Sequence, residues 1–166
     1  MSYLTIKFSS NHIRNNFSCG NAPLDNYITT QVSQDIKKKL TACFVIIDDN
    51  YEIRGYYTLS NASISIDDTP ENIKTKMPRG YTALPVTLLG RLAVDSKSQG
   101  KKLGELLLID ALKRSFEVSE TIGSNAIIVD PVDKQAVEFY RKYGFISLDS
   151  GRMFITMKTV GDLFNS

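Results

Sequence analysis

A largely apolar stretch of the chain leads through a short polar loop into a leucine-rich segment. Residues 86–94 are almost continuously apolar, which predicts a strand buried on both faces. Residues 100–118 carry large apolar side chains on nearly every side, which predicts a covered helix. The loop before that helix contains Gly100 and Gly104. A strand that runs through a glycine-bearing loop into a helix directs backbone N–H groups at one point, so the pattern predicts an anion site.

Upstream, the pattern predicts a strand, a helix and a hairpin. Weak alternation over residues 3–8 predicts a first strand. Apolar positions three or four apart in residues 21–39 predict an amphipathic helix that is capped by Asn21 and ends in three lysines. Two β-rich runs flank an Asp-Asp-Asn turn and predict an antiparallel hairpin, at residues 42–48 and 53–66.

Downstream, residues 67–81 contain two prolines and several charges, which predicts an excursion between strands. Residues 126–129 form a short apolar run, and a strand–helix–strand of this spacing implies a right-handed parallel crossover. A second helix is predicted to begin after Asp133 and to stop at Gly144. Two closing strands are predicted at residues 145–148 and 153–158.

Composition narrows the class of protein. The 166 residues predict one domain, residues 1–166, and 42% hydrophobic with 23% charged residues is typical of a globular protein. No apolar run reaches the roughly 20 residues that span a membrane, and the N-terminus lacks a signal-peptide pattern, so we expect a cytoplasmic protein without a membrane partner. His12 is the single histidine, and Cys19 and Cys43 lack metal-ligand spacing, which argues against a metal site or a histidine-based triad.

Three sequence motifs in this order resemble the GCN5-related N-acetyltransferase (GNAT) family: LGRLAVD with the glycine loop, AIIVD, and AVEFYRKYGF. The glycine loop alone also suits a dinucleotide or P-loop site, but the P-loop motif is absent and a dinucleotide fingerprint would stand on an early strand. The resemblance covers nearly the whole chain. It implies an α+β, three-layer fold with a mixed, mostly antiparallel sheet, one splayed parallel strand pair and helices on both faces.

The resemblance also implies the cofactor site. The loop would bind the pyrophosphate of acetyl-CoA, and the pantetheine arm would pair with the strand at residues 92–94. Lys102 stands where the family has a glycine; if this position needs positive φ, the side chain strains the loop. No metal is implied. The implied cofactor-binding residues are Leu92, Ala93, Val94, Gln99, Gly100, Lys101, Lys102, Leu103, Gly104, Pro131, Ala136 and Phe139.

Tyr140 is the candidate catalytic residue. In the family the matching tyrosine reaches the thioester sulfur, and a phenol is a suitable general acid for the leaving thiolate. Backbone N–H groups of residues 92–94 would stabilise the oxyanion. No general base is evident, which favours an α-amine, with a pKa of about 7.7–8.0, over a lysine amine, with a pKa of about 10.4.

Further motifs resemble the acetyltransferase toxins of type II toxin–antitoxin systems: FSCGNAPLDNYI, GYYTLS, LLGRLAVD, and FYRKYGF with MFITMKT. This resemblance implies acetylation of the amino group of aminoacyl-tRNA, a block of translation, a homodimer, and a ribbon-helix-helix antitoxin. A charge inside an apolar strand must be paired or functional, which singles out Arg91. The candidate substrate-binding residues are Lys37, Lys38, Arg79 and Arg91.

Two other functions stay open. One is a housekeeping N-acetyltransferase that acts on a protein N-terminus or a small amine. The other is a non-catalytic module of the same fold that senses acyl-CoA. The presence of Tyr140 disfavours this second function.

Overall fold

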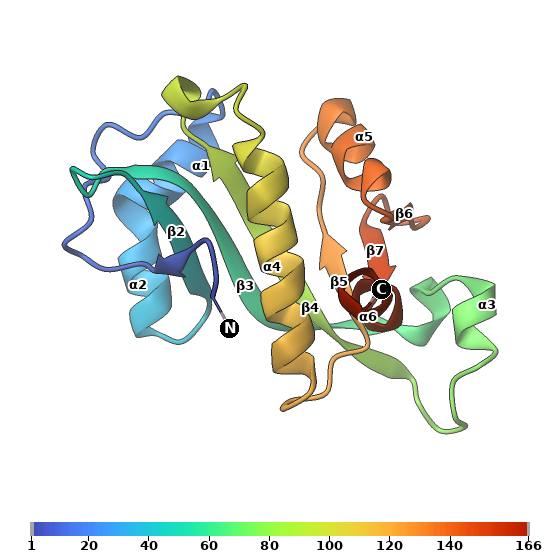
Figure 1. Ribbon diagram of the computed structural model, residues 1–166. Coiled ribbons are helices and arrows are strands. Elements are labelled where there is room, and N and C mark those ends of the chain that lie inside the picture. The colour runs from blue at the N-terminus through green and yellow to red at the C-terminus, as the bar shows by residue number, and fades with distance from the viewer. Residues whose placement is uncertain (1, 166) are drawn as a thin grey trace. The chain divides into compact units, whose positions relative to one another are not determined.

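Three long elements, β3 (Ile53–Ser65), β4 (Ala83–Val94) and α4 (Leu103–Ser119), each contribute residues to two structural units (Figure 1). The computed structural model describes residues 2–165. Unit 1 contains the chain up to Ser60 together with Leu89–Leu112, and unit 2 contains Asn61–Leu88 together with the chain from Lys113 onward.

The strands of unit 1 follow the order β1 (Ile6–Lys7), β2 (Ala42–Ile47), β3, β4. β2 pairs with β1 and with β3 in antiparallel fashion, and Cys43 lies opposite Thr58. The predicted turn of the β2–β3 hairpin is confirmed: the Asp48 carboxylate accepts hydrogen bonds from the backbone N–H groups of Asn50 and Glu52.

Helices cover both faces of the unit 1 sheet, as predicted. Tyr56 points into a core that it shares with α1 (Ala22–Asn26), the π-helical turn η1 (Tyr27–Gln31) and α2 (Val32–Lys37). Its neighbour Tyr57 points to the opposite face, because successive strand residues alternate, and donates a 2.8 Å hydrogen bond to Asp110 of α4. Asp110 also accepts from the backbone N–H of Leu4 and the hydroxyl of Thr5, which fixes the N-terminal segment to α4.

Unit 2 continues β3 and β4 and adds β5 (Ala126–Val129), β7 (Met153–Thr156) and β6 (Ile146–Ser147), in that spatial order. β4 and β5 run parallel, as predicted, whereas β5–β7 and β7–β6 are antiparallel. The excursion after β3 holds two short helical segments, η2 (Ile66–Asp68) and α3 (Glu71–Lys74). A separate core unites these strands; it includes Ile64, Val86, Ile128, Leu148 and Phe154.

The second predicted helix is confirmed as α5 (Lys134–Lys142). The Asp133 carboxylate accepts from the backbone N–H of Ala136 at 2.8 Å, which is the expected N-cap bond. Gly144 follows the helix with a φ of +99°, a left-handed conformation that ends a helix at little cost for glycine.

Other predicted boundaries were wrong. The last strand was predicted to extend to residue 158, but β7 ends at Thr156 and a helix not predicted, α6 (Met157–Asn165), begins at the next residue. The first strand shrinks to two residues, β4 begins earlier than predicted, at Ala83, and α4 begins later, at Leu103. The helix at residues 21–39 is interrupted by η1.

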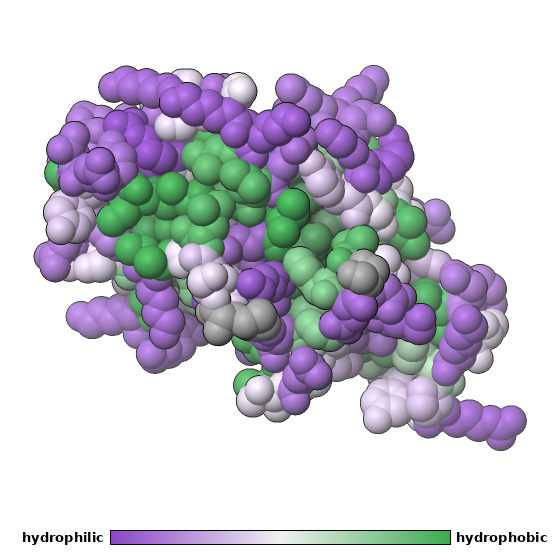
Figure 2. Space-filling view, viewed as in Figure 1, coloured by the Kyte–Doolittle hydropathy of each residue, from purple (hydrophilic) through white to green (hydrophobic). Residues whose placement is uncertain are grey.

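The surface of unit 1 carries exposed apolar side chains on β1, the segment before it, and α4. They belong to Leu4, Ile6, Leu106 and Ile109, and Figure 2 shows a hydrophobic area on this face. Within residues 2–165, no helix is both long and apolar enough to cross a membrane.

Gly55 of β3 lies close to α4, and Gly55→Ala tests this contact. A Cβ there would lie 2.8 Å from Cδ1 of Leu107, which is fully buried, and 3.3 Å from the carbonyl oxygen of Ala93. Overpacking should lower the free energy of unfolding by about 1–3 kcal/mol in urea denaturation. Gly123→Ala is the control, since a Cβ there meets nothing within 4 Å. Equal stability of the two variants would contradict this packing.

Candidate cofactor and catalytic site

The loop between β4 and α4 has the backbone geometry of an anion cradle. After β4 the chain forms a 3₁₀ turn, η3 (Ser96–Ser98), and then reaches Gly100 with a φ of +83° and Lys102 with a φ of +58°. Alternation of left-handed and ordinary residues turns successive N–H groups toward one point. The N–H groups of residues 100–104 have no backbone or side-chain acceptor among residues 2–165. These groups are therefore available to a diphosphate.

Lys102 adopts the conformation that glycine tolerates best. This position has the positive φ at which a lysine was expected to strain the loop. A non-glycine residue in the left-handed region costs about 1–2 kcal/mol. Lys102 is exposed, and it is one of the residues whose N–H groups form the cradle.

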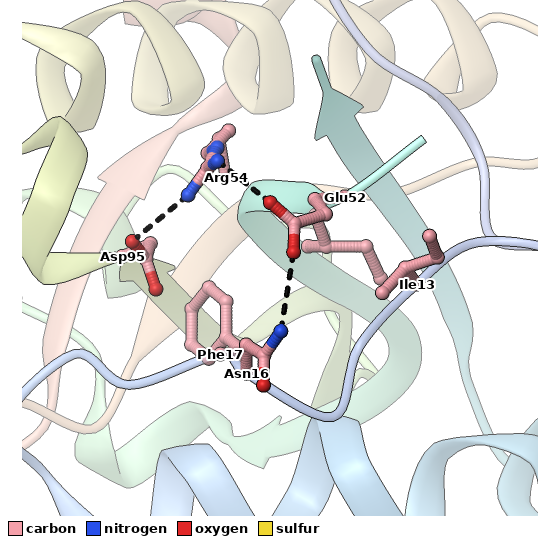
Figure 3. A pocket seen from close by; sticks show the side chains of 7 residues that line it. Ile13, Asn16, Phe17, Glu52, Arg54 and Asp95 are labelled. Carbon is pink, nitrogen blue, oxygen red and sulfur yellow. Dashed lines mark hydrogen bonds and ion pairs between the residues drawn. The ribbon is translucent and has the colours of Figure 1, made fainter. Parts of the chain in front are cut away.

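Asp95 fixes the start of this loop (Figure 3). Its carboxylate, with the residue only 2% exposed, accepts hydrogen bonds from the backbone N–H groups of Ser18 at 3.0 Å and Lys97 at 3.1 Å. The guanidinium of Arg54 lies 3.3 Å from the same carboxylate. Arg54 also pairs with Asp48 at 2.7 Å and Glu52 at 2.8 Å. We call Asp95 and its partners Ser18, Arg54 and Lys97 the Asp95 anchor.

The segment before α1 supports the loop from a second side. The backbone N–H and the hydroxyl of Ser96 both donate to the carbonyl of Ser18, at 2.7 and 2.8 Å. The amide nitrogen of Gln99 donates to the carbonyls of Cys19 and Val94, at 3.2 and 3.1 Å. Gln99 was predicted as a cofactor contact; in the structure its side chain holds the loop in place.

Unit 2 presents Tyr140 on the inner face of α5. Its ring packs against Phe139 and Phe145, each with a centroid distance of 5.3 Å, and the residue is 9% exposed. Burial raises the pKa of Tyr140 to about 12, so the phenol keeps its proton at neutral pH. The hydroxyl has no hydrogen-bond partner in the described part of the chain. Its proton is therefore not engaged by another group of the described chain.

The other predicted residues fall into the two units separately. Unit 1 brings residues 92–94 and the loop together, with Ala93 in its core and Leu92 and Val94 half-buried. Pro131, Ala136 and Phe139 belong to unit 2, as does Tyr140, and the N–H of Ala136 donates to the Asp133 side chain in the helix cap.

The predicted substrate-binding residues differ in environment. Lys37 and Lys38 are exposed at the end of α2, and Arg79 is exposed in unit 2. Arg91 is half-buried, and its guanidinium lies 3.5 Å from the centroid of the Tyr27 ring. His12 is buried, and its Nδ1 accepts from the N–H of Ser9, a structural role. Residues 2–165 contain no group of three or more His, Cys, Asp or Glu residues arranged to hold a metal ion.

Sequence reasoning missed the Asp95 anchor. The available signal was an acidic residue at the end of a buried strand, two positions before Lys97, because an aspartate there can accept from the N–H two residues on. The partners Ser18 and Arg54 are distant in sequence, so no local pattern indicates them.

Lys102→Gly tests the strain in the loop. Relief of the left-handed lysine exceeds the entropy that glycine adds to the unfolded chain, so the free energy of unfolding should rise by about 0.5–1 kcal/mol. Lys101→Gly is the matched control, because Lys101 does not have positive φ, and it should lower the same free energy by a similar amount. Urea denaturation of both variants measures this, and destabilisation by Lys102→Gly equal to that of Lys101→Gly would exclude the strain.

Comparison with known proteins identifies the family. The model of the acetyltransferase (GNAT) domain matches residues 74–158. A tRNA-acetylating toxin from Mycobacterium tuberculosis is 36% identical over 129 residues, which cover 78% of this chain and 75% of that protein. A probable toxin TacT from Sinorhizobium fredii is 28% identical over 162 residues, covering 92% of this chain and 89% of that protein.

Solved structures agree on the fold. A tyrosine-to-phenylalanine mutant of KacT has a TM-score of 0.86 at 26% identity and covers 92% of both chains. AtaT complexed with acetyl-methionyl-tRNAfMet has a TM-score of 0.90 at 24% identity and covers 99% of this chain and 100% of that one. With the family model and the M. tuberculosis relative in agreement, the chain belongs to the GNAT family of acetyltransferases.

Proposed function

We propose that the protein transfers the acetyl group of acetyl-CoA to the α-amino group of an aminoacyl-tRNA and thereby blocks translation. The observation that carries this proposal is the 36% identity to a tRNA-acetylating toxin. Two features support the proposal: the loop between β4 and α4 in unit 1, with positive φ at Gly100 and Lys102, and the protonated phenol of Tyr140 in unit 2.

The residues of the cradle fit the phosphates of acetyl-CoA. Residues 100–104 offer consecutive N–H groups, and the ammonium groups of Lys101 and Lys102 add positive charge. When bound, acetyl-CoA supplies an activated thioester carbonyl. In the proposed reaction the acceptor nitrogen first bonds to this carbonyl carbon and gives a tetrahedral oxyanion, and the collapse of this oxyanion breaks the carbon–sulfur bond and releases a thiolate.

Tyr140 then donates its phenolic proton to the departing thiolate, and the proton lost by the amine restores the phenol through solvent. The raised pKa of Tyr140 keeps the phenol protonated at neutral pH, so a proton donor is in place when the thiolate forms. Backbone N–H groups of residues 92–94 stabilise the transient oxyanion. An α-amine, with a pKa of about 7.7–8.0, is substantially neutral at pH 7–8 and attacks without a dedicated base.

The partners form part of the same proposal. The resemblance of the sequence motifs to toxins of type II toxin–antitoxin systems favours a homodimer in the cytoplasm that a ribbon-helix-helix antitoxin neutralises. The exposed Lys37, Lys38 and Arg79 provide positive charge for the tRNA backbone.

Tyr140→Phe tests the function. Expression of the parent protein alone should arrest growth and translation, whereas the variant should not, because loss of a general acid lowers kcat by about 10²–10⁴-fold. Tyr143→Phe, on the same helix end, is the matched control and should remain toxic. Equal growth of cells that express the parent and Tyr140→Phe would refute the toxin function and leave the fold untouched.

Asp95→Asn tests whether the anchor presets the cradle. The variant is isosteric but loses the charge that Arg54 and the two N–H groups bind. Isothermal titration calorimetry should show the Kd for acetyl-CoA raised about tenfold, which corresponds to 1.4 kcal/mol. The exposed Asp149→Asn should bind like the parent. An unchanged Kd in Asp95→Asn would show that the loop holds its shape without the anchor.

A further inference from the structure

The helical stretch after Asn21 contains a π turn that the proposed reaction does not explain. α1 passes into η1 and then into α2 without leaving the helix. A π turn inserts one extra residue into the hydrogen-bond ladder, is rare, and frequently lies at a functional site. The hydroxyls of Thr29 and Thr30 donate to the carbonyls of Asp25 and Asn26, at 2.9 and 2.8 Å, so side chains help to satisfy the backbone here.

The π turn brings Tyr27 and Asp35 to the same side of the helix. In a regular α-helix, residues eight positions apart point about 80° away from each other. The extra residue removes most of this angle, and the Tyr27 hydroxyl donates a 3.0 Å hydrogen bond to Asp35. Burial, and then the bond to Asp35, raise the pKa of Tyr27 well above its ordinary value, so the phenol remains a donor and the ring keeps one orientation.

The Tyr27 ring in turn holds Arg91. The guanidinium carbon lies over the ring, 3.5 Å from its centroid, which is a close cation–π contact. Within residues 2–165 the Arg91 guanidinium has no hydrogen bond and no carboxylate partner. A guanidinium has five N–H donors in its plane, and stacking fixes that plane without using them. A half-buried arginine is therefore held with its donors free.

Other groups near Arg91 are polar but neutral. Burial raises the pKa of the Cys43 thiol to about 12, and the charge of Arg91 only partly opposes this, so Cys43 offers no anion. Thr58 lies opposite Cys43 on β3, and among residues 2–165 its buried hydroxyl has no hydrogen-bond partner. The hydroxyl of Tyr56 is committed to the carbonyl of Leu24 at 2.7 Å. These three residues do not neutralise the guanidinium.

We propose that Arg91 binds a phosphodiester of the single-stranded 3′ end of the acceptor RNA, and that Tyr27 and Asp35 are its positioning residues. This inference rests on the proposed function. The planar donors of arginine match two phosphate oxygens. Lys37 and Lys38, on the same helical stretch as Tyr27 and Asp35, extend the positive surface that an RNA backbone would follow. The phosphates of acetyl-CoA have their own N–H donors in the cradle.

Arg91→Gln tests the proposal in two arms. The KM for aminoacyl-tRNA should rise about tenfold or more, because a charge-assisted pair is lost. The slope of log(kcat/KM) against log salt should become shallower by about 0.7, the value for one contact to a single strand. The Kd for acetyl-CoA, measured by calorimetry, should stay within about twofold of the parent. Arg91→Lys keeps the charge without the planar donors, so it should keep the salt slope and lose part of the affinity.

Two variants at Tyr27 separate positioning from folding, with the melting temperature of each as the check on structure. Tyr27→Phe keeps the ring and loses the bond to Asp35, and should raise the KM for aminoacyl-tRNA less than Arg91→Gln does. Tyr27→Leu removes the ring on which Arg91 stacks, and it should raise the KM for aminoacyl-tRNA nearly as much as Arg91→Gln does.

An unchanged salt slope in Arg91→Gln overturns the phosphodiester contact. A raised Kd for acetyl-CoA with an unchanged KM for aminoacyl-tRNA assigns Arg91 to the cofactor and also overturns it. A parent protein that binds acetyl-CoA but acetylates no aminoacyl-tRNA overturns the proposed function together with this inference, so the two failures are distinguishable.

Discussion

The buried carboxylate of Asp95 connects three segments of unit 1 that are distant in the sequence. A buried charge is tolerated only when it is paired and hydrogen-bonded, and here Arg54 of β3 and the N–H of Ser18 meet that demand from outside the loop. Because the bond to Lys97 comes from the loop itself, the path of the chain toward α4 is set by the same carboxylate. Donors that are fixed before an anion arrives need little reorganisation to bind it. Along this path Lys102 adopts a left-handed conformation that is unfavourable for a lysine.

Two buried tyrosines show how environment separates structural from chemical roles. Burial raises the pKa of both Tyr27 and Tyr140, so both keep their protons. The Tyr27 hydroxyl is committed to Asp35, and its ring face is covered by Arg91. The Tyr140 hydroxyl has no partner in the described chain, so only this phenol is free to give a proton to a leaving group.

Local sequence patterns predicted the elements that local physics determines. The hairpin with its Asp48 turn, the Asp133 cap and the Gly144 stop all depend on residues within a few positions of one another. The end of β7 was missed because Met157 and Val160 are buried and apolar, so α6 looked like a continuing strand. Gly161 also made α6 hard to predict, because glycine is unfavourable inside helices. In the structure a Cβ at Gly161 would lie 2.6 Å from the Phe116 ring.

The candidate site was only partly predictable from the sequence, because local patterns do not indicate contacts between distant residues. The resemblance to a family indicated the loop and Tyr140, but the φ of Lys102 and the partners of Asp95 depend on packing. The π turn is invisible to a periodicity analysis, since Tyr27 and Asp35 stand eight positions apart and match no α-helical spacing.

The central claim is that the protein acetylates the amino group of an aminoacyl-tRNA. The most direct measurement is mass spectrometry of the aminoacyl-adenosine released by ribonuclease from charged tRNA after incubation with the protein and acetyl-CoA. This product should gain the mass of one acetyl group at its amino nitrogen. An unmodified product, under conditions in which the same preparation acetylates a small amine or a peptide N-terminus, would contradict the claim and assign the chain to another acceptor.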